Sequence, residues 1–183
     1  MKLNCDLGES FGAWSMPVEA AIMAEIDQAN IACGFHAGDP LVMKQAIRLA
    51  KQHDVDIGAH PAYPDLQGFG RRSMAIAADE LSAMIQYQVS ALSGMAKVCG
   101  ANVSYVKPHG ALYNDMMKDT AVMRTVMKSI AEINMQSLDS PLALMVQATS
   151  QNAALKEAAQ EWGLPLYFEA FSDRRYTDEG LLQ

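Results

Sequence analysis

The sequence predicts an α/β fold of the TIM-like (β/α) barrel type with fewer than eight strands, and two observations favour this class. Apolar runs of strand length alternate six times with segments of helical period, which is typical of a parallel sheet with right-handed crossovers. Polar residues gather after every expected strand but the fifth. Because a barrel brings the carboxyl ends of its strands to one mouth, it explains this gathering better than an open sheet does.

The six expected strands are short apolar runs, too short for a helix of normal length. His60 and Pro61 follow the third run, and the fourth leads to Pro108 and His109. The predicted strands are residues 2–6, 28–33, 55–59, 103–107, 142–147 and 166–171.

The helices between them are predicted from a 3.6-residue apolar period and from end signals. Asp39-Pro40 is typical of an N-cap followed by proline at the first helical position, and Gly163 closes the last helix. The predicted helices are residues 15–25, 41–52, 79–98, 119–134 and 150–162. Residues 61–73 hold prolines, glycines and adjacent arginines, so we expect a functional loop there.

Length and composition indicate one soluble domain spanning residues 1–183. Half of the 183 residues are hydrophobic and the formal net charge is −7, which argues against a nucleic-acid surface. No apolar run approaches the ~20 residues of a membrane span, and a charge appears too early for a signal peptide. Cys5, Cys33 and Cys99 are unclustered, so we expect a reducing compartment, the cytoplasm, and no structural zinc.

The site is predicted around residues 30–39, which read N-I-A-C-G-F-H-A-G-D. His36 lies between two glycines, where a strand has ended and a helix has not begun. In parallel α/β folds this carboxyl-end loop is where ligands bind. His60 and His109 follow the next two strands in the same way, whereas His53 ends a helical pattern and is expected on the surface.

Two acids, Asp6 and Asp173, follow the first and sixth strands. With the three histidines they predict a polar mouth suited to hydrolysis at a carbonyl, with or without a metal. Asp39 as a helix cap and His60 packed under its neighbouring proline are structural alternatives.

Three basic residues lie near this mouth. Lys107 precedes Pro108, which holds its backbone extended, so its ammonium either stabilises negative charge on a substrate or pairs with an acid. Arg71 and Arg72 are either a solvated pair or a clamp on a substrate carboxylate or phosphate. No G-x-G-x-x-G follows the first strand and no G-x-x-x-x-G-K-[ST] occurs, which disfavours dinucleotide and P-loop folds.

Six motifs in order, covering essentially the whole chain, resemble one known family. They are N-C-D-L-G-E at 4–9, N-I-A-C-G-F-H-A-G-D at 30–39, G-A-H-P-A-Y-P-D at 58–65, G-F-G-R-R at 68–72, V-K-P-H-G-A-L-Y-N at 106–114 and E-A-F-S-D-R-R-Y at 169–176. These motifs are similar to those of the LamB/YcsF family of bacterial 5-oxoprolinase A subunits.

The resemblance implies a barrel akin to the glycoside hydrolase/deacetylase barrels and hydrolysis of 5-oxo-L-proline to L-glutamate coupled to ATP hydrolysis. It also implies ATP as cofactor and subunits B and C as partners. Family members continue past residue 183, so we expect a barrel that lacks its C-terminal part.

The resemblance also implies a set of site residues. The expected catalytic residues are Asp6, Glu9, His36, His60, Lys107, His109 and Asp173. We expect Arg71, Arg72 and Asn30 to bind substrate.

Two other functions fit the same residues. The first is a metal-dependent carbohydrate or amide deacetylase in which Asp6, His60 and His109 bind zinc or a similar divalent ion. The second is a non-catalytic subunit that binds substrate for a complex. A metal analysis separates the first from a metal-free hydrolase, and a 5-oxoproline binding assay with and without partner subunits tests the second.

Overall fold

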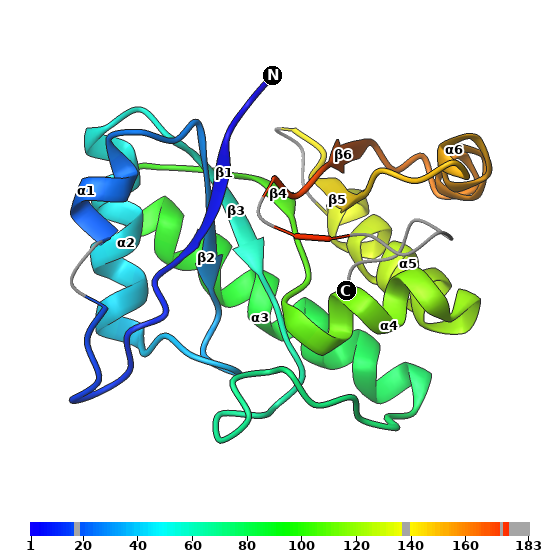
Figure 1. Cartoon of the computed structure of the whole chain (residues 1–183), viewed down its shortest axis with the longest axis horizontal. Coiled ribbons are helices and arrows are strands. Elements are labelled where there is room, and N and C mark those ends of the chain that lie inside the picture. The colour runs from blue at the N-terminus through cyan, green and yellow to red at the C-terminus, as the bar shows by residue number, and fades with distance from the viewer. Residues whose placement is uncertain (17–18, 137–139, 173, 176–183) are drawn as a thin grey trace.

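Six parallel strands form a single sheet in the computed structural model of the chain, which describes residues 1–16, 19–136, 140–172 and 174–175. The strand order in the sheet is the order along the chain, β1 to β6. The strands are β1 (Asn4–Leu7), β2 (Gln28–Ala32), β3 (Asp56–His60), β4 (Val103–Val106), β5 (Ala143–Gln147) and β6 (Leu166–Glu169). Figure 1 shows helices connecting each strand to the next, as the alternating pattern predicts.

The described helices agree with the predicted ones, with one addition. They are α1 (Glu19–Met23), α2 (Pro40–Gln52), α3 (Ala78–Val98), α4 (Gly110–Lys118), α5 (Thr120–Gln136) and α6 (Asn152–Gln160). Asp39 caps α2 by accepting hydrogen bonds from the backbone of Leu41 and Val42. The sequence did not predict α4, because Pro108 and Gly110 are loop signals, yet α4 buries an apolar face including Leu112.

The sheet curls into a half-barrel, which confirms the predicted fold class. Strands β1 and β6 are its two edges and are not paired with each other in the described part of the chain. Even so, Asn4 Nδ2 on β1 donates to Glu169 Oε2 on β6 at 3.2 Å. A hydrogen bond between side chains of the two edge strands requires the sheet to bend strongly around its inner face.

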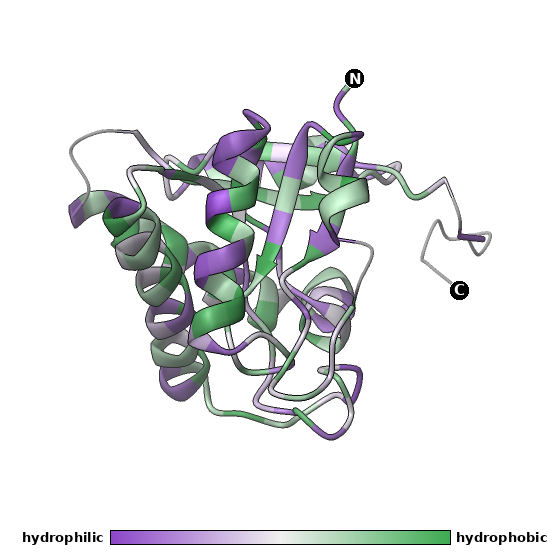
Figure 2. Cartoon of the chain, turned by 90° about the vertical axis from the view of Figure 1, so that its left-hand side faces the viewer, coloured by the Kyte–Doolittle hydropathy of each residue, from purple (hydrophilic) through white to green (hydrophobic). Residues whose placement is uncertain are grey.

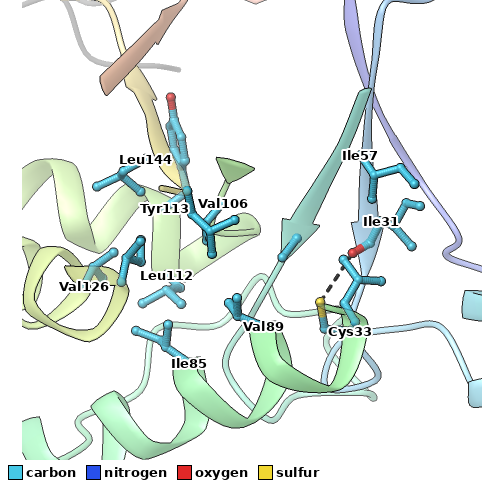
Figure 3. Packing of buried hydrophobic residues seen from close by; sticks show 14 of the residues in the cluster. Ile31, Cys33, Ile57, Ile85, Val89, Val106, Leu112, Tyr113, Val126 and Leu144 are labelled. Carbon is cyan, nitrogen blue, oxygen red and sulfur yellow. Dashed lines mark hydrogen bonds between the residues drawn. The ribbon is translucent and has the colours of Figure 1, made fainter. Parts of the chain in front are cut away.

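The two faces of the curled sheet differ in polarity because successive strand residues point to opposite faces. The outer face carries aliphatic side chains from β2 to β5, which pack against α3, α4 and α5 (Figure 3). Among them Ile31, Ile57, Val106 and Leu144 are at most 3% exposed. Each such side chain contributes about 1.5–3 kcal/mol when fully buried.

The helices that cover this outer face are amphipathic, and Figure 2 shows apolar and polar residues alternating along them. None of the described helices combines the length and apolarity that a membrane crossing needs. The inner face instead carries polar side chains, including Asn30, Tyr105 and Glu169. A curled sheet therefore gathers polar groups on its concave side.

Candidate functional site

Three histidine rings meet at the carboxyl ends of β2, β3 and β4. His36 lies in the loop after β2, His60 is the last residue of β3, and His109 is the residue before α4. The rings of His36 and His109 stack with centroids 3.7 Å apart, and His60 lies edge-on to His109 at 4.8 Å. All three residues are buried, at 5% exposure or less.

The loop after β3 covers these rings and is organised by a buried carboxylate, Asp65. Its carboxylate accepts hydrogen bonds from the backbone of Gly68 and from the guanidinium of Arg72, and its carbonyl accepts one from the backbone of Gly70. Gly70 has φ +66°, and a Cβ there would lie 2.7 Å from the His109 ring and 2.8 Å from His36 Cβ. Glycine is therefore required for the loop to approach the histidines so closely.

Hydrogen bonds to backbone carbonyls assign the tautomers of two of the histidines. The Nδ1–H of His60 donates to the carbonyl of Lys107 at 2.6 Å. The Nε2–H of His109 donates to the carbonyl of Phe69 at 2.8 Å. The remaining ring nitrogens, His60 Nε2 and His109 Nδ1, lie 2.9 Å apart. At this contact one nitrogen donates to the other where it carries a further proton, and two lone pairs face each other where both rings are neutral.

Glu9, in the loop after β1, completes this group. Its Oε1 lies 3.0 Å from His36 Nε2 and 3.5 Å from His109 Nδ1. One ligand atom from each of four residues lies within 4.8 Å of the others, a grouping able to hold a metal ion. We call Glu9, His36, His60 and His109 the histidine cluster. The metal set expected from the sequence included Asp6, whereas this grouping has Glu9 and His36 instead.

Burial governs ionisation in the histidine cluster. Desolvation, reinforced by His60, lowers the pKa of His36 to about 2. Desolvation and the neighbouring imidazoles lower the pKa of His109 to about 3. Desolvation also raises the pKa of Glu9 above that of an ordinary glutamate. His36 and His109 are therefore neutral at physiological pH, and their imidazole nitrogens are available as ligands or hydrogen-bond partners.

A second group surrounds Lys107 on the concave face of the sheet. Lys107 Nζ lies 3.2 Å from Asp6 Oδ1 and 3.1 Å from Glu169 Oε2, and it donates to Asn4 Oδ1 at 3.1 Å. Asn30 Nδ2 donates to Asp6 Oδ1 at 2.8 Å. We call Asn4, Asp6, Asn30, Lys107 and Glu169 the lysine network.

Opposite charges in the lysine network keep Lys107 and Asp6 ionised. Burial disfavours the charge on Lys107, but the carboxylates of Asp6 and Glu169 outweigh it and raise the pKa of the ammonium. Burial likewise opposes ionisation of Asp6, but His60, Lys107 and the Asn30 amide hold the pKa of this carboxyl well below its usual value. Asp6 Oδ2 also lies 3.4 Å from His60 Nε2, so Asp6 connects the two groups.

A groove of about 570 Å³ opens beside the histidine cluster. Apolar side chains from two loops dominate its lining, including Phe11, Trp14, Leu66 and Phe69, and Glu9 and His36 lie in its wall. The groove therefore offers an apolar cavity of small-molecule size with a carboxylate and an imidazole exposed to its contents.

The comparisons with known proteins agree with this architecture. The model of the LamB/YcsF family matches residues 1–183. The chain belongs to the LamB/YcsF family. A relative from Pseudomonas putida that is named as a 5-oxoprolinase A subunit is 56% identical over 180 residues, covering 98% of this chain and 68% of that protein. The 5-oxoprolinase A subunit of Vibrio parahaemolyticus is 52% identical over 182 residues, covering 100% of this chain and 70% of that protein.

A solved structure also resembles this LamB/YcsF chain. The lactam utilization protein from Thermus thermophilus superposes with a TM-score of 0.87 at 40% identity, covering 98% of this chain and 70% of that one. The half-barrel is therefore shared with a solved protein that is named for lactam utilization.

The LamB/YcsF chain brings most of the predicted site residues together. Six of these residues belong to the histidine cluster or to the lysine network: Asp6, Glu9, His36, His60, Lys107 and His109. Asn30 lies buried beneath Asp6. Asp173 lies outside the described residues.

The two predicted arginines are placed differently from each other. Arg72 pairs with the buried Asp65 and so holds the loop together. Arg71 lies with its guanidinium carbon 5.4 Å from the centroid of the Phe69 ring, near the groove. Of the pair, Arg71 has the position that better suits a contact with substrate.

Sequence reasoning missed Asn4 and Glu169, which belong to the lysine network, and Tyr105, which contacts it. A signal for Asn4 and Tyr105 existed in the period of two along the strands. Asn4 lies two residues before Asp6 on β1, and Tyr105 two residues before Lys107, so each shares the concave face with a residue that was predicted.

Proposed function

We propose that this LamB/YcsF chain is the A subunit of an ATP-hydrolysing 5-oxoprolinase, which opens the lactam of 5-oxo-L-proline to give L-glutamate. The names of its relatives support this assignment. The observation that carries it is Glu9, a carboxylate with a raised pKa in the wall of an apolar groove, in hydrogen-bond contact with His36. A carboxylate whose pKa is raised by burial is a stronger base than an exposed one and is suited to general-base catalysis.

In the proposed reaction, Glu9 accepts a proton from a water molecule whose oxygen attacks the lactam carbonyl carbon. The ring C–N bond then breaks, the nitrogen takes up a proton, and the product carries a new carboxyl group and a free amine. His36 orients the Glu9 carboxylate through the 3.0 Å contact of its Nε2. Arg71, beside the groove, is the residue we propose to pair with the substrate carboxylate.

Lys107 has a positioning role in this proposal. Its ammonium group has three N–H donors, and three oxygen acceptors, on Asn4, Asp6 and Glu169, already surround it. It therefore holds Asp6 next to His60 and does not contact the lactam. Asp6 Oδ2 in turn lies 3.4 Å from His60 Nε2.

ATP use belongs to the proposal through the resemblance to the family. The described residues at the mouth do not fit a triphosphate: Lys107 is engaged by two carboxylates and Arg72 by Asp65, and the sequence contains no P-loop. We therefore propose that ATP binds where subunits B and C contribute, and that the steps at this mouth are those of the lactam alone. The cytoplasmic location stays a prediction.

The test is reconstitution of the chain with subunits B and C, measuring glutamate release from 5-oxo-L-proline in the presence of ATP. Glu9→Gln should lower the rate by about 10²–10⁴, the typical contribution of a general base. His53→Gln, an exposed histidine at the end of α2, should leave the rate unchanged. The isolated chain should release little or no glutamate. Full activity of Glu9→Gln would exclude the proposed base.

A metal-dependent deacetylase is the second candidate, and the histidine cluster is the observation that favours it. Hydrolysis of an N-acetyl group at such a cluster would use the metal ion as a Lewis acid. Incubating the zinc-supplemented chain alone with N-acetylated amino sugars and measuring acetate release separates the two functions. Acetate release without ATP or partner subunits supports the deacetylase and contradicts the oxoprolinase assignment.

A further inference from the structure

We propose that the histidine cluster is a binding site for one divalent transition-metal ion of the zinc type, held by His36, His60, His109 and Glu9. The proposal concerns metal binding and stands whether or not the chain opens a lactam. Three independent features of the cluster carry it: the spacing of the ligand atoms, the hydrogen bonds behind two of the rings, and the charge around them.

The spacing of the ligand atoms suits a tetrahedral ion. Zinc–nitrogen and zinc–oxygen distances of about 2.0–2.1 Å place tetrahedral ligand atoms about 3.3 Å apart. In the cluster, His60 Nε2 lies 2.9 Å from His109 Nδ1, Glu9 Oε1 lies 3.0 Å from His36 Nε2, and Glu9 Oε1 lies 3.5 Å from His109 Nδ1. These three of the six pairs fall on both sides of the ideal spacing, and all six lie within 4.8 Å, so the more distant ligand atoms must move inward to bind an ion.

The hydrogen bonds behind His60 and His109 orient their lone pairs toward each other. Each ring donates its other N–H to a backbone carbonyl, of Lys107 and Phe69 respectively. A metal-binding histidine typically donates in this way, because the hydrogen bond fixes the tautomer and the ring orientation. The two facing nitrogens, 2.9 Å apart, are satisfied either by a proton that one of them carries or by a cation that binds both.

The charge around the cluster also favours a cation. Glu9 belongs to the cluster, and Asp6 Oδ2 lies 3.4 Å from His60 Nε2. The one lysine nearby in the described part of the chain, Lys107, is neutralised by Asp6 and Glu169.

The chemistry of the donors selects the class of metal. Three imidazoles and one carboxylate suit zinc, cobalt or nickel, whereas magnesium and calcium prefer sites built of oxygen. One carboxylate oxygen of Glu9 can bind the ion while its other oxygen remains free to accept a proton. The ion would supply Lewis acidity beside the groove.

The test is zinc binding by the purified chain after treatment with a chelator and removal of that chelator. Isothermal titration with Zn²⁺ should give one site with a submicromolar Kd, and the melting temperature should rise with zinc. Co²⁺ should give the intense visible absorption of a four-coordinate site. Mg²⁺ at the same concentration should neither bind this site nor compete with Zn²⁺.

Variants identify the ligands. His109→Gln and His36→Gln should each weaken zinc binding by about 100-fold or more, because loss of an outer hydrogen-bond partner alone typically costs 10–100-fold. Circular dichroism in the absence of metal checks that each variant is folded. His53→Gln, the matched control at the fourth histidine of the chain, should bind zinc like the parent.

Three results would overturn the proposal: no zinc binding by the folded parent chain, zinc binding that survives both cluster variants, or zinc binding that is lost in His53→Gln. The outcome is separate from the test of lactam hydrolysis. A chain that binds zinc at the cluster but supports no glutamate release in the reconstituted complex would sustain this inference and remove the proposed function.

Discussion

The histidine cluster and the lysine network share the concave side of the half-barrel, but they differ in whether a cation lies among their acceptor atoms. In the lysine network the ammonium of Lys107 meets three oxygen acceptors, and Asn30 bridges Asn4 and Asp6. One buried oxygen of this network, Glu169 Oε1, has no hydrogen-bond partner among the described residues. In the histidine cluster, two imidazole nitrogens and a carboxylate oxygen face one another with no lysine or arginine among them in the described part of the chain, and His36 Nδ1 has no hydrogen-bond partner there. Lys107 and the three histidines are all buried, so solvation does not explain the difference.

This contrast separates a group that holds the fold together from one that is prepared for a ligand. Buried polar groups are normally hydrogen-bonded, and an unsatisfied one needs an explanation of its own. The lysine network links β1, β2 and β6 with the residue after β4, and so fixes the curl of the sheet. The histidine cluster lies at the strand ends beside the groove, where an incoming group can complete its contacts.

The largest expected effect is the pH dependence of stability of the metal-free chain. The pKa of His36 is lowered to about 2 and that of His109 to about 3, whereas unfolded histidines titrate near 6.5. Between pH 6.5 and 3 the unfolded state therefore binds more protons, and the free energy of unfolding falls as the pH falls. The loss is at most roughly 2–3 kcal/mol per imidazole between pH 6.5 and 4.5.

Urea denaturation in the presence of a chelator at half-unit steps of pH measures this slope. Burial raises the pKa of Glu9, so this carboxyl opposes the trend just above pH 4.5, but one carboxyl does not cancel two imidazoles. His109→Asn should flatten the slope relative to the parent. A free energy of unfolding that stays level from pH 6.5 to 4.5 would contradict the neutral, buried state of these rings.

Lys107→Met tests the other side of the comparison. The substitution leaves Glu169 buried and unpaired and removes the counter-charge of Asp6, so the free energy of unfolding should fall by about 3–5 kcal/mol. Methionine keeps most of the stem volume, so little of this loss comes from packing. Chemical denaturation of the purified variant measures the change.

The double variant Lys107→Met/Glu169→Gln is the control for Lys107. Removing the charge on Glu169 as well should restore part of the lost stability, because the unpaired buried carboxylate is the main cost. A single variant as stable as the parent, with turnover abolished in the reconstituted complex, would instead show that Lys107 acts on the substrate.

The sequence predicted the fold well because the signals that define it are local. Strand and helix periods, the Asp39 cap and the glycines around His36 each act within a few residues, and the structure follows them. The sequence predicted no element at residues 110–118, where Pro108 and Gly110 flank the start of α4 and burial of Leu112 and Met116 stabilises a helix. Tertiary packing outweighs propensity there.

The sequence predicted most of the residues that lie in the site, but not how their side chains are arranged there. The position of Asp6, His60 and His109 at strand ends follows from the order of the chain. Which acid approaches which histidine depends on the curl of the sheet, which no local pattern encodes. Glu169 contacts Asn4 across 165 positions of sequence, and that contact exists only because the two edge strands approach each other.

Gly70→Ala should have the next largest effect and should disturb the histidine cluster more than the lysine network. Its φ of +66° and the 2.7 Å approach of a Cβ to the His109 ring both oppose any side chain. Stability should fall by about 1–3 kcal/mol, and the displaced ring should weaken zinc binding. Melting temperature and zinc titration on the same preparation measure both effects.

Gly94→Ala in α3 is the matched control for Gly70, because a Cβ there meets nothing within 4 Å. This change should raise stability by about 0.4–1 kcal/mol through lower entropy of the unfolded chain, without altering zinc affinity. If both alanine variants behaved alike, the close approach of the loop to the rings would carry no energetic weight.

Tyr105→Phe is the smallest of these changes and addresses the lysine network alone. The Tyr105 hydroxyl donates to Asn30 Oδ1 at 2.6 Å, and this bond sets which way the Asn30 amide points. Asn30 Nδ2 then donates to both Asn4 Oδ1 and Asp6 Oδ1. Removing the hydroxyl leaves a buried acceptor unsatisfied, so the free energy of unfolding should fall by about 1–2 kcal/mol.

Zinc affinity should stay within about twofold in Tyr105→Phe. The Tyr105 hydroxyl contacts no member of the histidine cluster, and the effects of a substitution fall mainly on residues that it contacts directly. A large loss of zinc affinity with unchanged stability would mean that the two groups work as one unit, joined through Asp6 and His60, and the division between fold and ligand site would not hold.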